Sequence, residues 1–479
     1  MTTNSSAAAA PAIPTKKLVC IAIGIAILLA SHLMPSVLGL KLTAIRTLGV
    51  MVTVVFWWVT EALPIPVSGL LVLPLLHING GANFNKVVAQ SFGDPFVPFM
   101  VGCLALSVAF SLSGLGKRIT YIILSISGTK VSSILNAYFW VPFVISGFIT
   151  DLAVVAMMYP IALSLAKAVN AQPGKSNFGL CLMFAITFGG VIGGLCTPSG
   201  VPSNIIAISF MEKNAHLTMS FLEWTMIATP IAVAIGLISQ WLTRKIYPPE
   251  IDRLPFGPEV IKKELEEMGP WTMAQKNTLA VFFAAVLLWL TGDFTKLPIA
   301  VVSVVVLALL TIPGFSAVKG WRDIEANMEW GSLMLQVGGF ALGVAAFDSG
   351  LASWLAQYAL KPLAAVPAIL QPFAVTMLVA IDSLGFSSFT AASAVNVPLV
   401  IAYAQQNGFP VASLAMSAGL ASSTHFILVT ESLCFVLTYA SGYYTFKDLF
   451  KVGSILTILS ALIIAGGLIA FGMPAGTPM

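Results

Sequence analysis

The sequence predicts an all-α polytopic membrane protein built from two inverted repeats, and three observations support this fold class. First, 58% of the 479 residues are apolar, with only 23 basic and 19 acidic residues, well below the charged share of soluble domains. Second, the mean hydropathy of +0.95 leaves no polar stretch long enough for a separate soluble core, so a soluble enzyme is excluded. Third, two segments in opposite halves of the chain resemble each other.

The chain has room for about ten to twelve membrane spans at about 20 residues each. We expect the first span at Leu18–Leu38, after the pair Lys16-Lys17, with the N-terminus in the cytoplasm. Residues 1–15 resemble a disordered tail. The net charge of +4 is scattered over short loops, so it bears on membrane orientation and predicts no nucleic-acid partner.

The most charged segment, residues 244–276, predicts a linker between two halves. It holds six basic and six acidic residues and five prolines. Its basic residues predict that it lies on the cytoplasmic side of the membrane, on the same side as the N-terminus.

The internal repeat pairs Met100–Leu115 with Gln336–Leu351, at an offset of 236 residues. The two segments share nine of sixteen positions, including a closing Ser-Gly-Leu. The stretch after the first copy is basic and the stretch after the second is almost uncharged, which predicts opposite orientations. Two similar halves of opposite orientation are typical of inverted-repeat transporters.

Each half continues with two interrupted apolar segments. Segments 132–167 and 370–405 have polar centres at 146–151 and 382–390, a pattern that predicts re-entrant hairpins whose tips line a cavity. The following segments, 178–211 and 411–440, are also interrupted, which predicts helices that are unwound within the membrane. The first interruption, residues 189–204, holds two glycine pairs and two prolines, and the second, residues 422–432, holds His425 and Glu431.

Unwound backbone at membrane depth offers carbonyl oxygens to a cation and helix N-termini to an anion. The interruptions therefore predict an ion-coupled carrier of a small anion. A channel with the same repeats is a distant alternative, and saturable flux would distinguish the two. An enzyme is not expected, because Asp151 and Asp382 lack the sequence settings of intramembrane aspartyl proteases.

Three motifs resemble the divalent anion:sodium symporters, which transport di- and tricarboxylates and sulfate. They are Trp58–Pro66, similar to W-x-T-E-A-[IL]-P; Thr197–Asn204, similar to T-P-x-G-T-P-P-N; and the ending from Ser441 to Gly453. The resemblance implies a homodimer of eleven-helix protomers with two re-entrant hairpins, each protomer combining a scaffold with an elevator-like transport domain. It also implies a multi-pass protein of a bacterial inner membrane and Na⁺ as the coupling ion.

On this basis we expect six regions. They are the tail 1–15, scaffold helices 16–130, a transport-domain part 131–243, the linker 244–276, scaffold helices 277–368 and a second transport-domain part 369–475. The family places Ser-Asn-Thr at each hairpin tip, but the matching positions here are Thr150-Asp151-Leu152 and Ser388-Phe389-Thr390. Both amides are thus missing.

The resemblance and the interruptions together give the predicted site residues. The substrate-binding candidates are Thr150, Asp151, Leu152, Thr197, Pro198, Ser388, Phe389, Thr390, Thr430 and Ser432. The cation-binding candidates are Thr150, Asp151, Gly194, Gly200, Asn204, Ser388, His425 and Glu431, with sodium at Asp151 and Gly200.

Several of these residues have a structural alternative. Asp151 is either a helix N-cap, an ion ligand or both. Glu431 and His425 form a buried structural pair, or Glu431 bonds to backbone, or one of the two titrates during transport. Asp382 is expected to cap or orient the second hairpin and not to bind ligand, and Glu61 is expected to support the scaffold.

The departures from the family also bear on coupling. We predict one sodium ion at the first-half site, with the second coupling role lost or taken by a proton at Glu431. The alternatives are a sodium-independent anion exchanger and a proton-coupled carrier.

Overall fold

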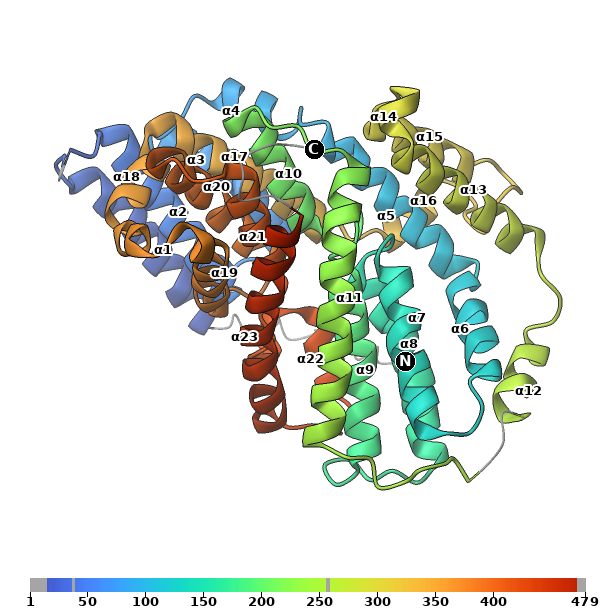
Figure 1. Cartoon of the computed structure of the whole chain (residues 1–479). Coiled ribbons are helices and arrows are strands. Elements are labelled where there is room, and N and C mark those ends of the chain that lie inside the picture. The colour runs from blue at the N-terminus through green and yellow to red at the C-terminus, as the bar shows by residue number, and fades with distance from the viewer. Residues whose placement is uncertain (1–14, 37–38, 256–258, 472–479) are drawn as a thin grey trace, which may run out of the picture.

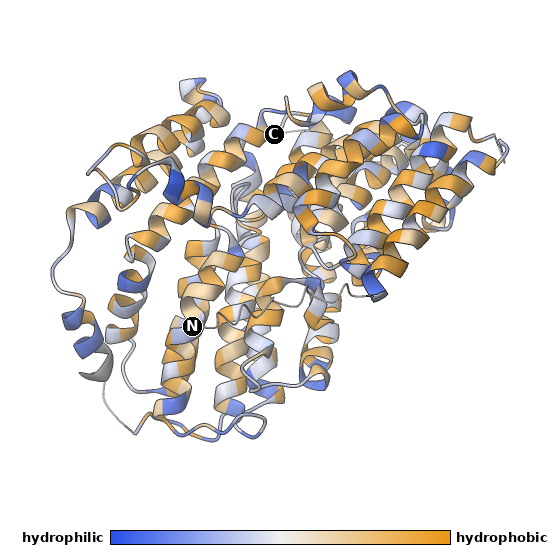
Figure 2. Cartoon of the chain, turned by 180° about the vertical axis from the view of Figure 1, so that it is seen from behind, coloured by the Kyte–Doolittle hydropathy of each residue, from blue (hydrophilic) through white to orange (hydrophobic). Residues whose placement is uncertain are grey.

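The computed structural model describes residues 15–36, 39–255 and 259–471, and all regular structure in these residues is helical. The tail expected at 1–15 lies almost entirely outside the described residues. The outer faces of many helices are apolar (Figure 2), as in α1 (Thr15–Leu33), where Leu29 is 62% exposed. Exposed apolar helix faces of this length suit a lipid environment, so the polytopic membrane fold is confirmed.

The two halves of the chain contain the same succession of helices. After α1, the first half holds α2 (Leu42–Thr60), α3 (Ile65–Ile78), α4 (Phe84–Ser91), α5 (Phe96–Leu112), α6 (Leu115–Ile126), α7 (Val131–Ser146), α8 (Asp151–Ala168), α9 (Asn177–Gly193), α10 (Pro202–Ala215) and α11 (Phe221–Ile246).

The second half repeats this order and adds one short helix, α14, and four 3₁₀ turns, η1 to η4. It holds α13 (Met273–Leu290), α14 (Gly292–Thr295), α15 (Ile299–Leu310), α16 (Trp321–Asn327), α17 (Trp330–Ser349), α18 (Leu351–Tyr358), η1 (Lys361–Ala365), η2 (Ala368–Leu370), α19 (Gln371–Asp382), η3 (Ser383–Gly385), α20 (Phe389–Asn407), α21 (Val411–Ala421), η4 (Val429–Glu431), α22 (Leu433–Tyr439) and α23 (Phe446–Ala470).

The repeated Ser-Gly-Leu has a local structural cause. It lies where α5 meets α6 and where α17 meets α18, and both glycines, Gly114 and Gly350, are left-handed, with φ of 67° and 80°. In each copy the serine hydroxyl accepts a hydrogen bond from the leucine N–H two residues later, at 3.3 and 3.4 Å. Glycine adopts this backbone conformation without steric cost, so the motif marks the same sharp turn in each repeat.

The two repeats interlock through helices that approach closely at glycines. α3 packs on α17 and α5 packs on α15, so the second helix of each repeat packs against the fourth helix of the other repeat. A Cβ atom on Gly69 would lie 2.6 Å from the Met334 carbonyl oxygen, and one on Gly102 would lie 2.3 Å from that of Ser303. Figure 1 shows the α13–α15 group and the α1–α3 group on opposite sides of the molecule.

Glycines also explain the packing of the hairpin on the first interrupted helix. A Cβ atom on Gly189 or Gly193 of α9 would lie 2.4 and 2.2 Å from the carbonyl oxygens of Phe139 and Phe143 in α7. The glycine pairs thus allow α7 and α9 to pack at backbone distance.

The linker differs from the expected range at both ends. α11 continues to Ile246 and α13 begins at Met273, and between them lies α12 (Glu259–Glu267), which packs on α6. Arg118 of α6 donates hydrogen bonds to the carbonyl oxygens of Met268 and Gly269, at 2.9 and 2.8 Å. The segment is thus held to the first half by backbone carbonyls.

Within the described residues, eight helices are long and apolar enough to cross a membrane. A ninth span results if α4 and α5, bent by 44° relative to each other, count as one. Five further apolar helices are 10–17 residues long: α3, α7, α9, α15 and α21. The expected total of about eleven spans stays a prediction.

Candidate functional site

The first hairpin has its tip between α7, which ends at Ser146, and α8, which begins at Asp151. Thr150 occupies the N-cap position, without a side-chain capping bond, and Asp151 is the first helical residue. The Asp151 carboxylate accepts a hydrogen bond of 2.8 Å from the N–H of Leu152. The interpretation of Asp151 as the N-cap was therefore wrong by one residue, but its charge still faces the positive end of the helix dipole.

The second hairpin has an equivalent tip with different chemistry. α20 begins at Phe389, the position that Asp151 holds in α8, and Ser388 is the N-cap without a side-chain bond. The Ser387 hydroxyl donates a 3.1 Å hydrogen bond to the Trp58 carbonyl oxygen at the end of α2. Asp382 is exposed and forms no side-chain cap at the 3₁₀ turn that follows it, so the structure does not show a capping role, and the alternative role of orienting the hairpin stays a prediction.

The first helix break, residues 194–201, is closed by the side-chain amide of Asn204. Its nitrogen donates to the carbonyl oxygens of Gly194 and Thr197 at 3.0 and 2.8 Å, while its oxygen, buried, has no partner among the described residues. Thr197 donates from its hydroxyl to the Gly147 carbonyl oxygen at the tip of the first hairpin. The break and the hairpin tip are therefore one hydrogen-bonded unit.

Gly200 is required for the closure of this break. A Cβ atom at Gly200 would lie 2.3 Å from the Gly194 carbonyl oxygen. The two glycines bring the ends of the break together, so Gly194 and Gly200 shape the site through backbone contact.

The second helix break, residues 422–432, is closed by a carboxylate. Glu431 accepts hydrogen bonds from the N–H groups of Ile427 and Leu428, at 3.1 and 2.9 Å. Of the alternatives for Glu431, the structure thus shows bonding to backbone. Ser432 accepts from the N–H of Cys434 at 3.2 Å and caps α22.

His425 lies apart from Glu431 and from the cavity described below. It is buried, its Nδ1 lies 3.2 Å from the Ala421 carbonyl oxygen, and its ring meets that of Phe389 edge-on. Its Nε2 has no partner among the described residues. No hydrogen bond or ion pair joins it to Glu431 in this part of the chain, so the expectation of a Glu-His pair was wrong.

Both hairpin tips and both breaks open on one cavity of about 440 Å³. This volume suits a small organic ligand. The cavity is lined at the first turns of α8, α10, α20 and the short α22. Four half-helices therefore direct their N-termini, with their positive dipole ends, at one volume.

About half of the predicted site residues line this cavity. Those that line it are Thr150, Asp151, Leu152, Ser388, Phe389, Thr390, Glu431 and Ser432. Those that do not are Thr197, Pro198, Gly194, Gly200, Asn204, Thr430 and His425. The first-break residues form the wall behind the cavity, where Val201 and Pro202 reach its surface.

Sequence reasoning missed two acidic cavity residues and two serines. Glu329, the residue before α17, and Ser332 were not considered. Ser387 was placed in the second hairpin tip but not among the site residues, and Glu61 was assigned to scaffold support alone. Glu61 has a left-handed backbone, with φ of 47°, between α2 and α3. A non-glycine residue in this conformation within a proline-rich turn is uncommon, but sequence alone does not show what it faces.

The charge of the lining is one-sided. Among the described residues that line the cavity, Glu61, Asp151, Glu329 and Glu431 are acidic and none is basic. Four helix N-termini favour an anion, whereas four carboxylates favour cations. An anion is therefore best accommodated here together with cations.

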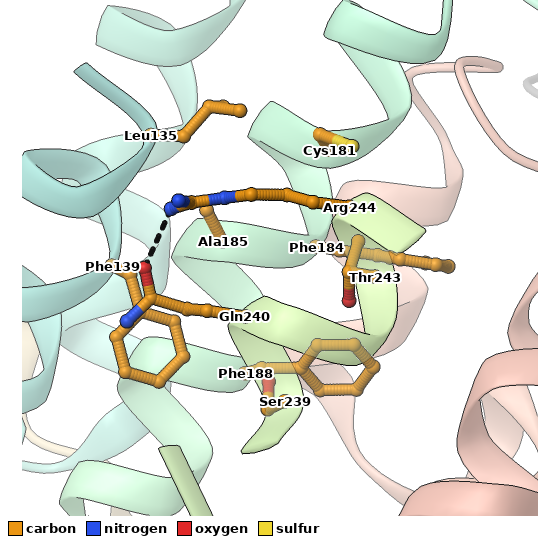
Figure 3. A pocket seen from close by; sticks show the side chains of 10 residues that line it. All are labelled: Leu135, Phe139, Cys181, Phe184, Ala185, Phe188, Ser239, Gln240, Thr243 and Arg244. Carbon is orange, nitrogen blue, oxygen red and sulfur yellow. Dashed lines mark hydrogen bonds between the residues drawn. The ribbon is translucent and has the colours of Figure 1, made fainter. Parts of the chain in front are cut away.

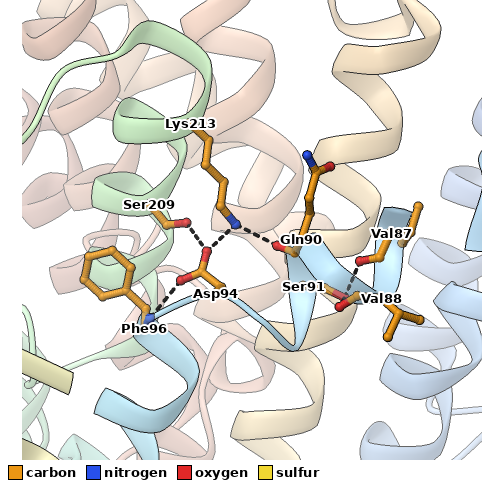
Figure 4. Close-up of polar contacts among 8 residues, drawn as sticks. All are labelled: Val87, Val88, Gln90, Ser91, Asp94, Phe96, Ser209 and Lys213. Atoms are coloured by element: carbon orange, nitrogen blue, oxygen red, sulfur yellow. Dashed lines mark hydrogen bonds and ion pairs between the residues drawn. The ribbon is translucent and has the colours of Figure 1, made fainter. Parts of the chain in front are cut away.

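A buried ion pair connects α10 to the turn between α4 and α5 (Figure 4). The Asp94 carboxylate, 2% exposed as a residue, pairs with the Lys213 ammonium and accepts bonds from the Ser209 hydroxyl and the Phe96 N–H, at 2.6 and 2.8 Å. Lys213 also donates to the Gln90 carbonyl oxygen at 2.7 Å. Asp94 therefore has a full set of partners away from the cavity.

Comparison with known proteins places this chain in a family. The sequence profile described as "Sodium:sulfate symporter transmembrane region" matches residues 15–477. The sodium-dependent dicarboxylate transporter SdcS of Staphylococcus saprophyticus is 27% identical over 85% of this chain and 82% of its own length. SdcS of Staphylococcus aureus strain USA300 is 27% identical over 88% of this chain and 84% of its own length.

Two solved structures share the fold at low sequence identity. The YdaH transporter of Alcanivorax borkumensis matches with a TM-score of 0.55 and 16% identity, over 82% of this chain and 89% of its own. MtrF of Neisseria gonorrhoeae, described as one of a class of antimetabolite efflux pumps, matches with a TM-score of 0.57 and 13% identity, over 95% of both chains. The family match confirms the resemblance to divalent anion:sodium symporters, and the chain is a multi-pass membrane protein of the sodium:sulfate symporter family of transporters.

Proposed function

We propose that the chain is a secondary transporter that moves a small di- or tricarboxylate across the membrane together with sodium. The staphylococcal relatives are named as sodium-dependent dicarboxylate transporters, and this supports the substrate class and the ion. The convergence of four half-helix N-termini with four carboxylates on one cavity carries the proposal.

The substrate carboxylates would lie at these N-termini, where unpaired N–H groups and the helix dipoles stabilise negative charge. Thr150, Ser388, Thr390 and Ser432 add side-chain oxygens. Because no basic side chain lines the cavity among the described residues, the co-transported cations supply the counter-charge. Occupancy by anion and cation is thereby coupled.

One sodium ion is proposed at the first half, with Asp151 as its charged ligand. Asp151 is the acidic residue at the first hairpin tip and lines the cavity. Asn204, Gly194 and Gly200 hold the neighbouring break in shape. At the second half, where Phe389 offers no oxygen, the coupling role is lost or falls to a proton at Glu431.

The proposed movement is of the elevator type. Hairpins and broken helices, residues 131–243 and 369–475, would move as a unit against a scaffold of residues 16–130 and 277–368. The pair of Lys213 with Asp94 crosses that boundary, so it would have to open in each cycle. A homodimer in a bacterial inner membrane, with a cytoplasmic N-terminus, completes the proposal.

Uptake by proteoliposomes tests this function. Radiolabelled succinate should accumulate under an inward sodium gradient and not under equal choline or potassium, and unlabelled citrate and sulfate should rank the anions by competition. Full uptake in sodium-free buffer, with efflux accelerated by external substrate, would contradict sodium coupling and favour the exchanger. Flux that does not saturate would favour a channel.

A further inference from the structure

A second cavity, remote from the first, lies between the start of α7, the end of α11 and the linker. Its volume is about 310 Å³. Its lining residues are Lys130, Val131, Ser132, Leu135, Arg244, Pro249, Ile251, Asp252 and Arg253. None of them lines the cavity of the proposed transport site.

The linker forms one wall of this cavity through backbone pairing. The N–H of Val131 donates to the Asp252 carbonyl oxygen at 3.0 Å, and the N–H of Leu254 donates to that of Thr129 at 2.9 Å. This short antiparallel bridge fixes Arg253 beside Lys130 at the first turn of α7.

The lining carries three basic side chains against one carboxylate, a net formal charge of +2. None of the three forms an ion pair within the described residues. Arg244 donates instead to neutral oxygens, the side-chain carbonyls of Asn136 and Gln240, the latter at 2.7 Å (Figure 3). Positive charge therefore converges here from three segments and exceeds the negative charge of the lining.

The nearby acidic residues are engaged elsewhere. Glu250 accepts hydrogen bonds from the Ser176 hydroxyl and from the N–H of Phe178 at the start of α9. Asp448 accepts from the Tyr247 hydroxyl at 2.7 Å and from Thr445. Asp252 is exposed and is thus the one acidic group facing the cavity.

We propose that this cavity binds a phosphate group. A phosphate carries more than one negative charge and three acceptor oxygens at neutral pH, which suits two guanidinium groups, one ammonium group and the Ser132 hydroxyl at a helix N-terminus. Val131, Leu135, Pro249 and Ile251 add an apolar wall. The group is supplied either by an anionic lipid of the cytoplasmic leaflet, whose head groups bind basic pockets between helices, or by a free phosphate compound.

Two probes distinguish the sources in the purified full-length protein. Thermal unfolding is followed with inorganic phosphate, and lipid binding is measured by native mass spectrometry with phosphatidylglycerol against phosphatidylcholine. Stabilisation by inorganic phosphate supports a free phosphate ligand. Binding of phosphatidylglycerol alone supports the lipid.

The double variant Lys130→Ala/Arg253→Ala tests the location, because both side chains are exposed and leave the core unchanged. We expect it to bind whichever probe the parent protein binds at least about tenfold more weakly. The matched control is Lys262→Ala/Lys263→Ala, which removes two exposed linker cations outside the cavity. An equal loss in both double variants, unchanged binding in the first, or no response to either probe would overturn the proposal.

Discussion

The two repeats share a backbone frame but differ in the polar groups at equivalent points. At the first residue of the second hairpin helix, the first repeat has Asp151 and the second has Phe389. The first break is closed by the amide of Asn204, and the second by the carboxylate of Glu431.

A second pair of acidic residues, which lie just before corresponding helices of the two repeats, shows the same division. Asp94 precedes α5 and Glu329 precedes the corresponding helix α17. Asp94 is buried and paired with Lys213, whereas Glu329 lines the cavity without an ion pair in the described residues. Symmetry of the fold thus does not extend to charge, because each polar group has different hydrogen-bond and ion-pair partners within its own repeat.

The largest effect is expected from breaking the Asp94 pair. Lys213→Met leaves a buried carboxylate unpaired and should destabilise the protein by about 3–5 kcal/mol in detergent unfolding experiments. The exposed pair of Lys86 with Asp348, 2.7 Å apart and on the same side of the scaffold, provides the control. Lys86→Met should cost no more than about 1 kcal/mol.

The double variant Lys213→Met/Asp94→Asn should recover much of the lost stability, since no charge stays buried. If Lys213→Met unfolds at the same temperature as Lys86→Met, the pair contributes nothing that its exposed counterpart lacks. That result would remove the distinction between the buried, paired carboxylate of Asp94 and the carboxylate of Glu329, which has no ion pair within the described residues.

The next effect concerns the hairpin tips. Asp151→Ala removes the proposed charged sodium ligand and should lower initial uptake about tenfold to a hundredfold, since a charged contact contributes about 1.5–3 kcal/mol. Asp382→Ala, at the exposed acidic residue of the other hairpin, should transport like the parent. Near-normal uptake by a folded Asp151→Ala protein would assign Asp151 to helix stabilisation alone.

Asn204→Ala should cost about 1–3 kcal/mol of stability, because the carbonyl oxygens of Gly194 and Thr197 lose their donor. It should also reduce the stabilisation by sodium in thermal unfolding. Asn277→Ala breaks a comparable 2.7 Å bond to the Phe315 carbonyl oxygen far from the cavity, and should leave the sodium effect intact. If sodium stabilises the two variants equally against thermal unfolding, the first break does not contribute to cation binding.

The smallest effect is expected at the second break. Glu431→Gln keeps the side-chain length and one acceptor oxygen, so the fold should survive with a modest loss of uptake. If Glu431 exchanges a proton during transport, uptake should depend on pH less steeply in this variant than in the parent. Uptake would be measured at roughly unit steps between pH 5.5 and 8.5. Identical pH profiles would contradict proton exchange at Glu431 and favour the alternative in which the second coupling role is lost.

The helices and their interruptions were largely predictable because their causes are local. Long apolar stretches predict spans, and Ser-Gly-Leu at 113–115 and 349–351 predicts equivalent turns because glycine allows the left-handed backbone. Prolines and glycines around 189–202 interrupt a helix wherever it lies. The bounds of the linker were less accurate, because α11 continues to Ile246 and α13 begins at Met273, where Thr272 caps its N-terminus.

By itself, the sequence determined the membrane class, the repeats and the four interruptions, since each of these depends on residues that are close together in the chain. Only the tertiary structure decided which polar groups share one space. Glu61 and Glu329 stand hundreds of residues apart, yet they meet Asp151 and Glu431 in one cavity. Asp94 instead meets Lys213. Such contacts depend on how helices distant in the sequence pack together, as α3 does on α17, and this packing leaves no periodic trace in the chain.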